Sequence, residues 1–340
     1  RLENSVTAED NERLNGQLTE NFIKANKKRI KRKKEVTLEI DSTDDPAYGE
    51  QQMVLFNGYY GEYMYHPLII HDRESGMVVR IKLRAGNVHT SDGVVEEIDK
   101  VVKKLRERFK DIRIKLVADS GFSIPELYRY CERKDINIEY LIVIKTNSVI
   151  NSKIEAKIKG NKIVEKIKRE DGNRYYSSIK YKAESWEKQR RVIIKISHSE
   201  EEENGIRVRK IVTNMKGRAK ELYEEYEKRG EQENRIKELK NGFKADRLSC
   251  KKFSANEFRL LIYTHAYNII VLFREQIKGS EIENSQIESL RTKLIKVGVM
   301  IKESVRRIWV YISSSWPYQR IYKEVKESLS KVKIGLLSVS

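Results

Sequence analysis

The sequence predicts a mixed α/β fold in which a β-sheet is flanked by helices. Apolar residues alternate with polar ones at 36–40 and again at 112–118, the period-2 pattern of strands with one buried face. Between these two runs, apolar residues at 94–109 follow three- and four-residue steps, which predicts an amphipathic helix. Short β-prone runs at 148–207 predict an antiparallel insertion, and the residues after 217 predict a mainly helical region.

The remaining elements follow in chain order. Extended runs after the first strand predict an antiparallel meander, and the 112–118 strand is followed by a helix and a further buried strand. The insertion includes a strand expected at 162–167, and a last strand at 208–214 returns to the main sheet. The expected meander strands are 53–60, 64–71 and 77–83, the later buried strand is 137–145, and the expected C-terminal helices are 217–241, 256–278, 285–302 and a segment within 309–329.

Composition restricts the classes of protein. Hydrophobic residues make up 39% of the 340 residues, enough for a core, and charged residues make up 35%, which excludes a collagen-like or low-complexity chain. The most apolar stretch, 260–273, is interrupted by polar residues, so we expect no membrane span. Cys131 and Cys250 lie far apart without a CxxC motif, which argues against a disulfide framework or a zinc site. We therefore expect a cytoplasmic protein.

The charge balance predicts an anionic partner. Lys and Arg total 69 against 51 Asp and Glu, a formal net charge of +18. Nucleic acid is the commonest partner of such chains, while a peripheral membrane protein would need an amphipathic helix with a basic face, which no segment shows cleanly. The tract 24–34 (KANKKRIKRKK) holds eight basic residues and no acid. It is read either as a solvated linker or as an arm along phosphates.

Two aspartates stand at the ends of predicted strands. Asp41 ends the first strand and Asp119 ends the 112–118 strand. If these strands are neighbours, their carboxylates lie together, repel one another and favour a hard metal ion with oxygen ligands. The ordinary alternative is that both residues open turns, which Asp commonly does.

A second pattern lies in the predicted helix 217–241. Tyr226, Arg229, Glu233 and Lys240 are spaced three, four and seven residues apart, which places them on one stripe of a regular helix. Such a stripe on the side facing the protein body suits a phosphate backbone and a divalent metal ion. A salt-bridged surface helix is the alternative, and spacing alone does not decide between them.

These motifs together resemble a known family. LEIDSTDDP around Asp41, VADSGF around Asp119, IVTN at the last strand and Y-x2-R-x3-E-x6-K from Tyr226 to Lys240 occur in that order. The set resembles the DDE transposases of bacterial insertion sequences, within the subgroup with the Y-R-E-K signature, the thirteen-eighty family. DRLSCKKFSANEFRLLIYTHAYN and the segment ending at Tyr318 also fit, and the similarity runs from about residue 35 to about 322.

The resemblance implies an RNase H-like catalytic core and a DNA-cutting and DNA-joining activity. In it Asp41, Asp119 and Glu233 would be catalytic and hold two Mg²⁺ ions, for which Mn²⁺ substitutes. Tyr226, Arg229 and Lys240 would grip the DNA of the transposon end. The implied partners are double-stranded DNA, as transposon ends and target, and a second copy of the chain in the DNA complex, with nucleoid association and no membrane.

The expected organisation has five parts. Residues 1–35 are expected to be the remnant of an N-terminal DNA-binding region and basic linker, because the family has more residues there and Arg1 is not a natural start. The catalytic core follows in two pieces around the insertion, and a helical region closes the chain; the boundaries are 36–147, 148–207, 208–278 and 279–340. Two alternatives stay open: an RNase H-like nuclease, and a DNA-binding remnant without activity.

Overall fold

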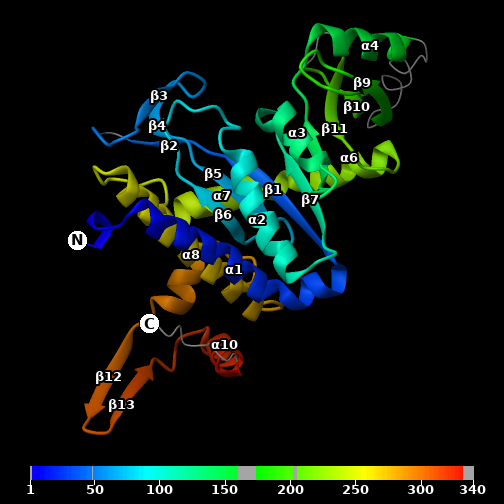
Figure 1. Cartoon of the computed structure of the whole chain (residues 1–340). Helices are drawn as coiled ribbons and strands as arrows, with labels where there is room; N and C mark the ends of the chain where they lie inside the picture. The colour runs from blue at the N-terminus through cyan, green and yellow to red at the C-terminus, as the bar shows by residue number, and fades with distance from the viewer. Residues whose placement is uncertain (1, 48, 160–173, 202–204, 332–340) are drawn as a thin grey trace.

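The computed structural model describes residues 2–47, 49–159, 174–201 and 205–331. Within them, a large sheet is covered by helices, as Figure 1 shows. The mixed α/β class predicted from the sequence is therefore confirmed. The strand expected at 162–167 and the last residues of the expected C-terminal region lie outside the described residues.

The large sheet has the order β6-β5-β1-β7-β8-β11-β10-β9. β1 pairs in parallel with β7, which pairs in parallel with β8, while the other neighbours are antiparallel. This order is consistent with the RNase H-like core that the resemblance predicts. The strands are β1 Glu35–Ser42, β5 Leu68–Asp72, β6 Val78–Lys82, β7 Arg113–Ala118, β8 Glu139–Val143, β9 Arg174–Tyr181, β10 Arg190–His198 and β11 Ile206–Thr213.

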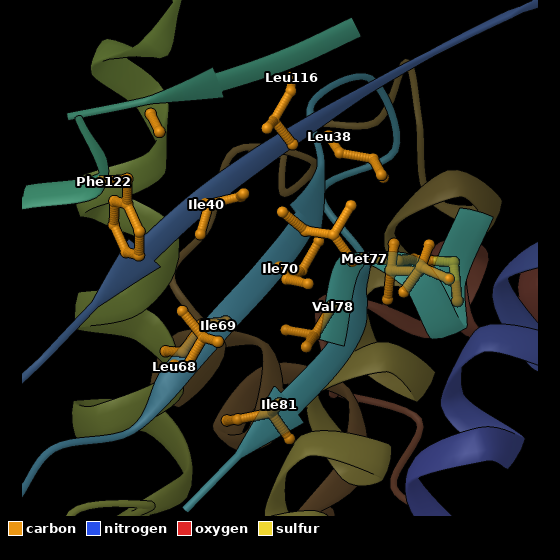
Figure 2. Close-up of a cluster of buried hydrophobic side chains, with 14 of the residues drawn as sticks. Leu38, Ile40, Leu68, Ile69, Ile70, Met77, Val78, Ile81, Leu116 and Phe122 are labelled. Atoms are coloured by element: carbon orange, nitrogen blue, oxygen red, sulfur yellow. The ribbon is translucent and has the colours of Figure 1, made fainter. Parts of the chain in front are cut away.

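The core lies between this sheet and its helices. Figure 2 shows part of it, where side chains of β1, β5, β6 and β7 meet around Leu38, Ile70 and Leu116. Each side chain of this kind stabilises the fold by about 1.5–3 kcal/mol when it is fully buried. The longer helices are α1 Ala8–Lys33, α2 Val94–Arg108, α3 Pro125–Glu132, α4 Ser148–Lys159, α6 Ala219–Glu227, α7 Gln232–Phe243, α8 Phe253–Gln276 and α10 Gln319–Lys331.

The N-terminal segment differs from expectation. Residues 8–33 form α1, which packs against β6 and α8 instead of forming a loose linker. Two of its buried polar residues satisfy backbone groups of the outermost strand, β6. Asn15 accepts from the Ile81 N–H at 3.2 Å, and Thr19 donates to the Val79 carbonyl at 3.0 Å. A polar sequence is thus part of the core, while the first turns of the helix and its basic C-terminal turns are mainly exposed.

Two other regions refine the sequence reading. The antiparallel strands of the predicted insertion, β9 and β10, extend the main sheet through β11 rather than forming a separate unit. In the C-terminal region the expected helix 285–302 is wrong in its second half. α9 (Ile287–Leu290) and a π-helical turn precede a hairpin of β12 (Val299–Ser304) and β13 (Arg307–Ile312), before α10. Figure 1 shows this hairpin projecting from the body.

A small sheet stands beside the carboxyl end of β1. It consists of β2 (Asp45–Pro46), β3 (Leu55–Asn57) and β4 (Glu62–Tyr65), in the order β2-β4-β3. The chain enters it directly from β1 and returns from it into β5. The connection between the first two strands of the core therefore overhangs the end of the sheet where Asp41 lies.

Candidate active site

Asp41 and Asp119 lie at matching ends of neighbouring strands. The parallel register of β1 and β7 pairs Ile40 with Ala118, so the residue after each pair member is an aspartate. One oxygen of each carboxylate is held locally: Asp41 Oδ1 accepts from the Ser42 N–H at 2.9 Å, and Asp119 Oδ1 accepts from the Gly121 N–H at 2.8 Å. The condition set out from the sequence, that the two strands are neighbours, is therefore met.

The carboxylates of this site act on one another electrostatically. Burial raises the pKa of Asp41 to about 6, with the charges of Asp119 and Glu233 adding to the rise and Arg229 opposing it. Both neighbours disfavour ionisation of Asp41 because like charges repel in a partly dry site. Glu233, which is exposed, thus makes the smaller of the two contributions to the raised pKa of Asp41.

Arg229 lies directly on the site. Its Nη2 donates to Asp41 Oδ2 at 2.8 Å, and its side chain is only 16% exposed. Its Nε is buried and has no hydrogen-bond partner in the described part of the chain. Tyr226 lies beside it: burial raises the pKa of this phenol, and the site's carboxylates add to that rise. A buried N–H without a partner is costly, so it is a natural donor to a ligand oxygen.

The helix that carries these residues is interrupted. α6 ends at Glu227, a 3₁₀ turn spans Lys228–Glu231, and α7 begins at Gln232. The expectation of one regular helix over 217–241, and of one straight stripe on it, is therefore wrong. Gly230 lies in the turn, where its backbone freedom disfavours a continuous helix.

The break redistributes the four signature residues. Arg229 contacts Asp41, whereas Lys240 forms an ion pair with Asp44, with 3.1 Å between Nζ and Oδ1. Glu233 stands in the first turn of α7 with an exposed side chain. The four residues thus lie on two helices and the turn between them, and not on one regular helix.

The donor set fits a hard divalent cation in part. Within the described ranges, no three His, Cys, Asp or Glu side chains converge closely enough to hold a metal ion. Two carboxylates are nevertheless adjacent. Burial is the main cause of the raised pKa of Asp41, and the repulsion between the carboxylates, which adds to that rise, is the kind that a bound cation relieves. In this structure Arg229 supplies the positive charge at that place.

A pocket of 430 Å³ opens at the two aspartates. Besides Asp41 and Asp119, it is lined by residues that the sequence analysis did not single out, including His89, Thr90 and Lys145. These residues follow strands or sit in loops, and spacing in the sequence carries no signal for them. The turn between β3 and β4 forms another wall of this pocket.

The fold and this acidic pocket define an α/β protein with a candidate phosphate-handling site, and comparison gives the family. The model of the family described as transposase DDE domain, group 1, matches residues 1–334, and the chain belongs to this family. A search of the curated proteins finds no match.

Among solved structures, the chain is similar to one in the cryo-EM structure of the piggyBac transposase synaptic complex with hairpin DNA. The two share 12% identity with a TM-score of 0.45, and the match covers 75% of this chain and 51% of the other. The chain thus spans about half the length of that relative. No helix in the ranges described is both long and apolar enough to cross a membrane.

Proposed function

We propose that the chain is a DNA transposase that cleaves at transposon ends and joins those ends to target DNA. Its membership of the DDE family supports the reaction class. The observation that carries the proposal is the Asp41–Asp119 pair at adjacent strand ends, with Arg229 hydrogen-bonded to Asp41 and its Nε free of partners in the described chain.

Each residue has a distinct part in this proposal. Asp41, Asp119 and Glu233 would hold two Mg²⁺ ions, or Mn²⁺ in their place, and these ions supply charge stabilisation to the attacking and leaving oxygens of phosphoryl transfer. Arg229 turns its free Nε to a phosphate oxygen, and Tyr226 limits the water that reaches it. Lys240 contributes a point charge on α7, next to the same end of the sheet.

The finer assignments belong to the same proposal. They are the Y-R-E-K subgroup, an origin in a bacterial insertion sequence, and action at the nucleoid in the cytoplasm. Double-stranded DNA is the proposed partner, and the basic excess of +18 supports it. A homodimer would pair two ends in the DNA complex.

The test is metal-dependent cleavage of a duplex that carries the DNA flanking the gene. We expect Mg²⁺ or Mn²⁺ to release a 3′-OH with the wild-type protein, and expect no product with Asp119→Asn or Glu233→Gln. Glu224→Gln is the matched control, because Glu224 is an exposed acid on α6 in the same region of the chain. It should cleave like the wild type.

The possible outcomes separate the alternatives. Equal cleavage by all four proteins would show that the activity lies elsewhere or is a contaminant. Cleavage by Glu233→Gln but not by Asp119→Asn would remove Glu233 from the metal-binding set. No cleavage by any of them, with salt-sensitive DNA binding retained, would favour the DNA-binding remnant.

A further inference from the structure

The hairpin of β12 and β13 has one aliphatic face. Residues that pair across two strands lie on the same face, and successive residues of a strand alternate between faces. One face therefore holds five aliphatic residues and Glu303, which are the cross-strand pairs Val299–Ile312, Ile301–Val310 and Glu303–Ile308. We call these six residues the aliphatic face. Ile301 is 64% exposed and Ile308 is 67% exposed, so large apolar side chains stand in solvent here.

The opposite face of the hairpin suits water better. It carries Lys302 and Arg307, and the Arg307 guanidinium lies 5.9 Å from the centroid of the Trp309 ring. The hairpin projects from the body of the protein (Figure 1), and a two-stranded hairpin alone is marginally stable in water. The aliphatic face therefore needs an apolar surface to pack on, and the elements that the structure describes leave most of it exposed.

A second apolar surface is exposed on α8. Residues 260–273 contain no Asp, Glu, Lys or Arg, a pattern typical of a helix that is buried on every side. Ile262, Ile269 and Leu272 are nevertheless exposed, Ile269 by 65%. Their spacing of seven and three residues places them along one side of the helix. We call these three residues the α8 stripe.

The aliphatic face and the α8 stripe carry complementary charges. Glu303 is the one charged residue of the aliphatic face. Arg259 lies one turn before Ile262, and its guanidinium donates to the neutral hydroxyls of Ser249 at 2.9 Å and Tyr263 at 3.1 Å. Within the residues that the structure describes, neither Arg259 nor Glu303 forms an ion pair. Each of these two charges is therefore available to a partner.

The two surfaces also match in length. From Glu303 to Val299 the strand spans four residue steps, about 13 Å at ~3.3 Å per step. From Arg259 to Ile269 the helix spans ten steps, about 15 Å at ~1.5 Å per step. When Glu303 meets Arg259, the base of the hairpin therefore reaches Ile269. The aliphatic side chains in between then lie on the α8 stripe.

We propose that the hairpin of one copy of this chain packs its aliphatic face on the α8 stripe of a second copy, with Glu303 against Arg259. The chain itself supplies both halves of the contact, and both are exposed within one chain, so the contact is made between two copies. Each copy gives one hairpin and receives another, and the assembly closes as a pair with twofold symmetry. This inference rests on the homodimer of the proposed function, names the surfaces that join it, and requires no DNA.

The first test measures the mass of the whole chain by light scattering, without DNA or divalent metal. We expect the wild type to give twice the 40.1 kDa of one chain at roughly 10 μM protein. Ile308→Asp, on the aliphatic face, and Ile269→Asp, on the α8 stripe, should each give the mass of a single chain. Met300→Asp is the matched control, because Met300 is exposed on the opposite face of the same hairpin, and it should leave the pair intact. Circular dichroism verifies that all variants are folded.

Mixing the two monomeric variants tests the exchange directly. Ile308→Asp keeps an intact α8 stripe and Ile269→Asp keeps an intact hairpin, so a one-to-one mixture restores one of the two contacts. We expect the mixture to form a pair, more weakly than the wild type does. A contact of hairpin against hairpin would leave the mixture monomeric, and that result would overturn the exchange. A wild type that stays monomeric would overturn it as well, and so would an Ile308→Asp protein that still pairs.

Charge reversal tests how the hairpin is seated. Arg259→Glu and Glu303→Arg should each weaken pairing at least about threefold, because like charges then meet. The double variant restores a pair of opposite charges and should recover most of the lost affinity. A double variant that pairs no better than either single variant would contradict the contact between Glu303 and Arg259.

Cleavage of the flanking DNA is measured separately on the same preparations. A wild type that pairs without cleaving would contradict the proposed function and still support the exchange of hairpins. Cleavage by a wild type that is monomeric without DNA would support the proposed function and overturn the exchange.

Discussion

Arg229 donates from Nη2 to Oδ2 of Asp41 at 2.8 Å, across 188 positions of the chain. The pair joins the turn between α6 and α7 to the end of β1. It also means that the first proposed metal ligand already carries a positive partner. A cation arriving at Asp41 has to compete with Arg229 or displace it toward the substrate.

Removal of Arg229 should therefore separate metal binding from catalysis. Without this guanidinium, we expect Arg229→Ala to bind Mn²⁺ roughly fivefold more tightly in the absence of DNA, because one repulsive charge is gone. DNA cleavage should fall at least about tenfold, because a charge-assisted contact to phosphate is lost. Calorimetry gives the first quantity and the cleavage assay the second. Lys228→Ala, which removes an exposed cation from the same turn, should change neither; unchanged metal affinity in Arg229→Ala would contradict the competition.

Asp45 should make the protein less stable as pH rises. Its side chain is 2% exposed, and neither carboxylate oxygen has a hydrogen-bond partner in the described chain. Burial and the charge of Asp246 raise its pKa to about 8. In the unfolded chain this group ionises near its ordinary pKa. The free energy of unfolding is therefore highest below pH ~4 and falls as pH rises toward ~8.

Asp45→Asn removes that dependence. We expect it to raise the free energy of unfolding by about 2–5 kcal/mol at pH 8.5, and by much less at pH 5. Urea denaturation at the two pH values measures the difference. Asp111→Asn, at an exposed position, should show no such trend. If Asp45→Asn changed the free energy of unfolding by the same amount at both pH values, titration of Asp45 would be ruled out as the cause.

Lys240 should contribute to DNA affinity through charge alone. Lys240→Ala is expected to weaken binding by a similar factor for every duplex sequence and to reduce the slope of log affinity against log salt by about one. Fluorescence anisotropy at several salt concentrations gives this slope. Lys103→Ala, on the exposed side of α2, is the matched loss of one lysine. If both variants show the same slope, Lys240 does not make a phosphate contact that Lys103 lacks.

Gly86 should be needed to seat the small sheet. In Gly86→Ala the new Cβ would meet the backbone of Met64, so we expect a loss of at least about 1–3 kcal/mol in the free energy of unfolding. Gly58→Ala, in the turn between β3 and β4, is the control, since nothing lies within 4 Å of a Cβ there. It should stay within about 0.5 kcal/mol of the wild type. Equal stabilities in denaturant would contradict the close approach.

The main sheet was predictable because its pattern is local. The alternation of Val36, Leu38 and Ile40 is enough to predict β1. These side chains belong to the hydrophobic core, part of which Figure 2 shows. α1 was not predicted, since its sequence is polar, and the burial of Asn15 and Thr19 depends on hydrogen bonds to the backbone of β6. A sequence pattern shows polarity, and it does not show which polar groups will meet an unpaired strand edge.

The candidate site was predictable in its parts but not in its connections. The neighbouring aspartates followed from strand ends, whereas the bond between Arg229 and Asp41 depends on a 3₁₀ turn that breaks helical periodicity. The exposed Tyr59 and the buried Tyr65 lie six positions apart in one tyrosine-rich segment. Only the packing of the small sheet distinguishes them.

The basic end of α1 and the aspartates sit at opposite ends of one strand. β1 begins at Glu35, next to the last turn of α1, and carries Asp41 toward its other end. Six residue steps at ~3.3 Å each separate the two by roughly 20 Å, more than two screening lengths in physiological salt. In the proposed DNA complex, the basic end of α1 and the aspartates would therefore act on the DNA as electrostatically independent charges. A duplex that touches both has a footprint of at least about six base pairs, at ~3.4 Å per pair, on a single protomer.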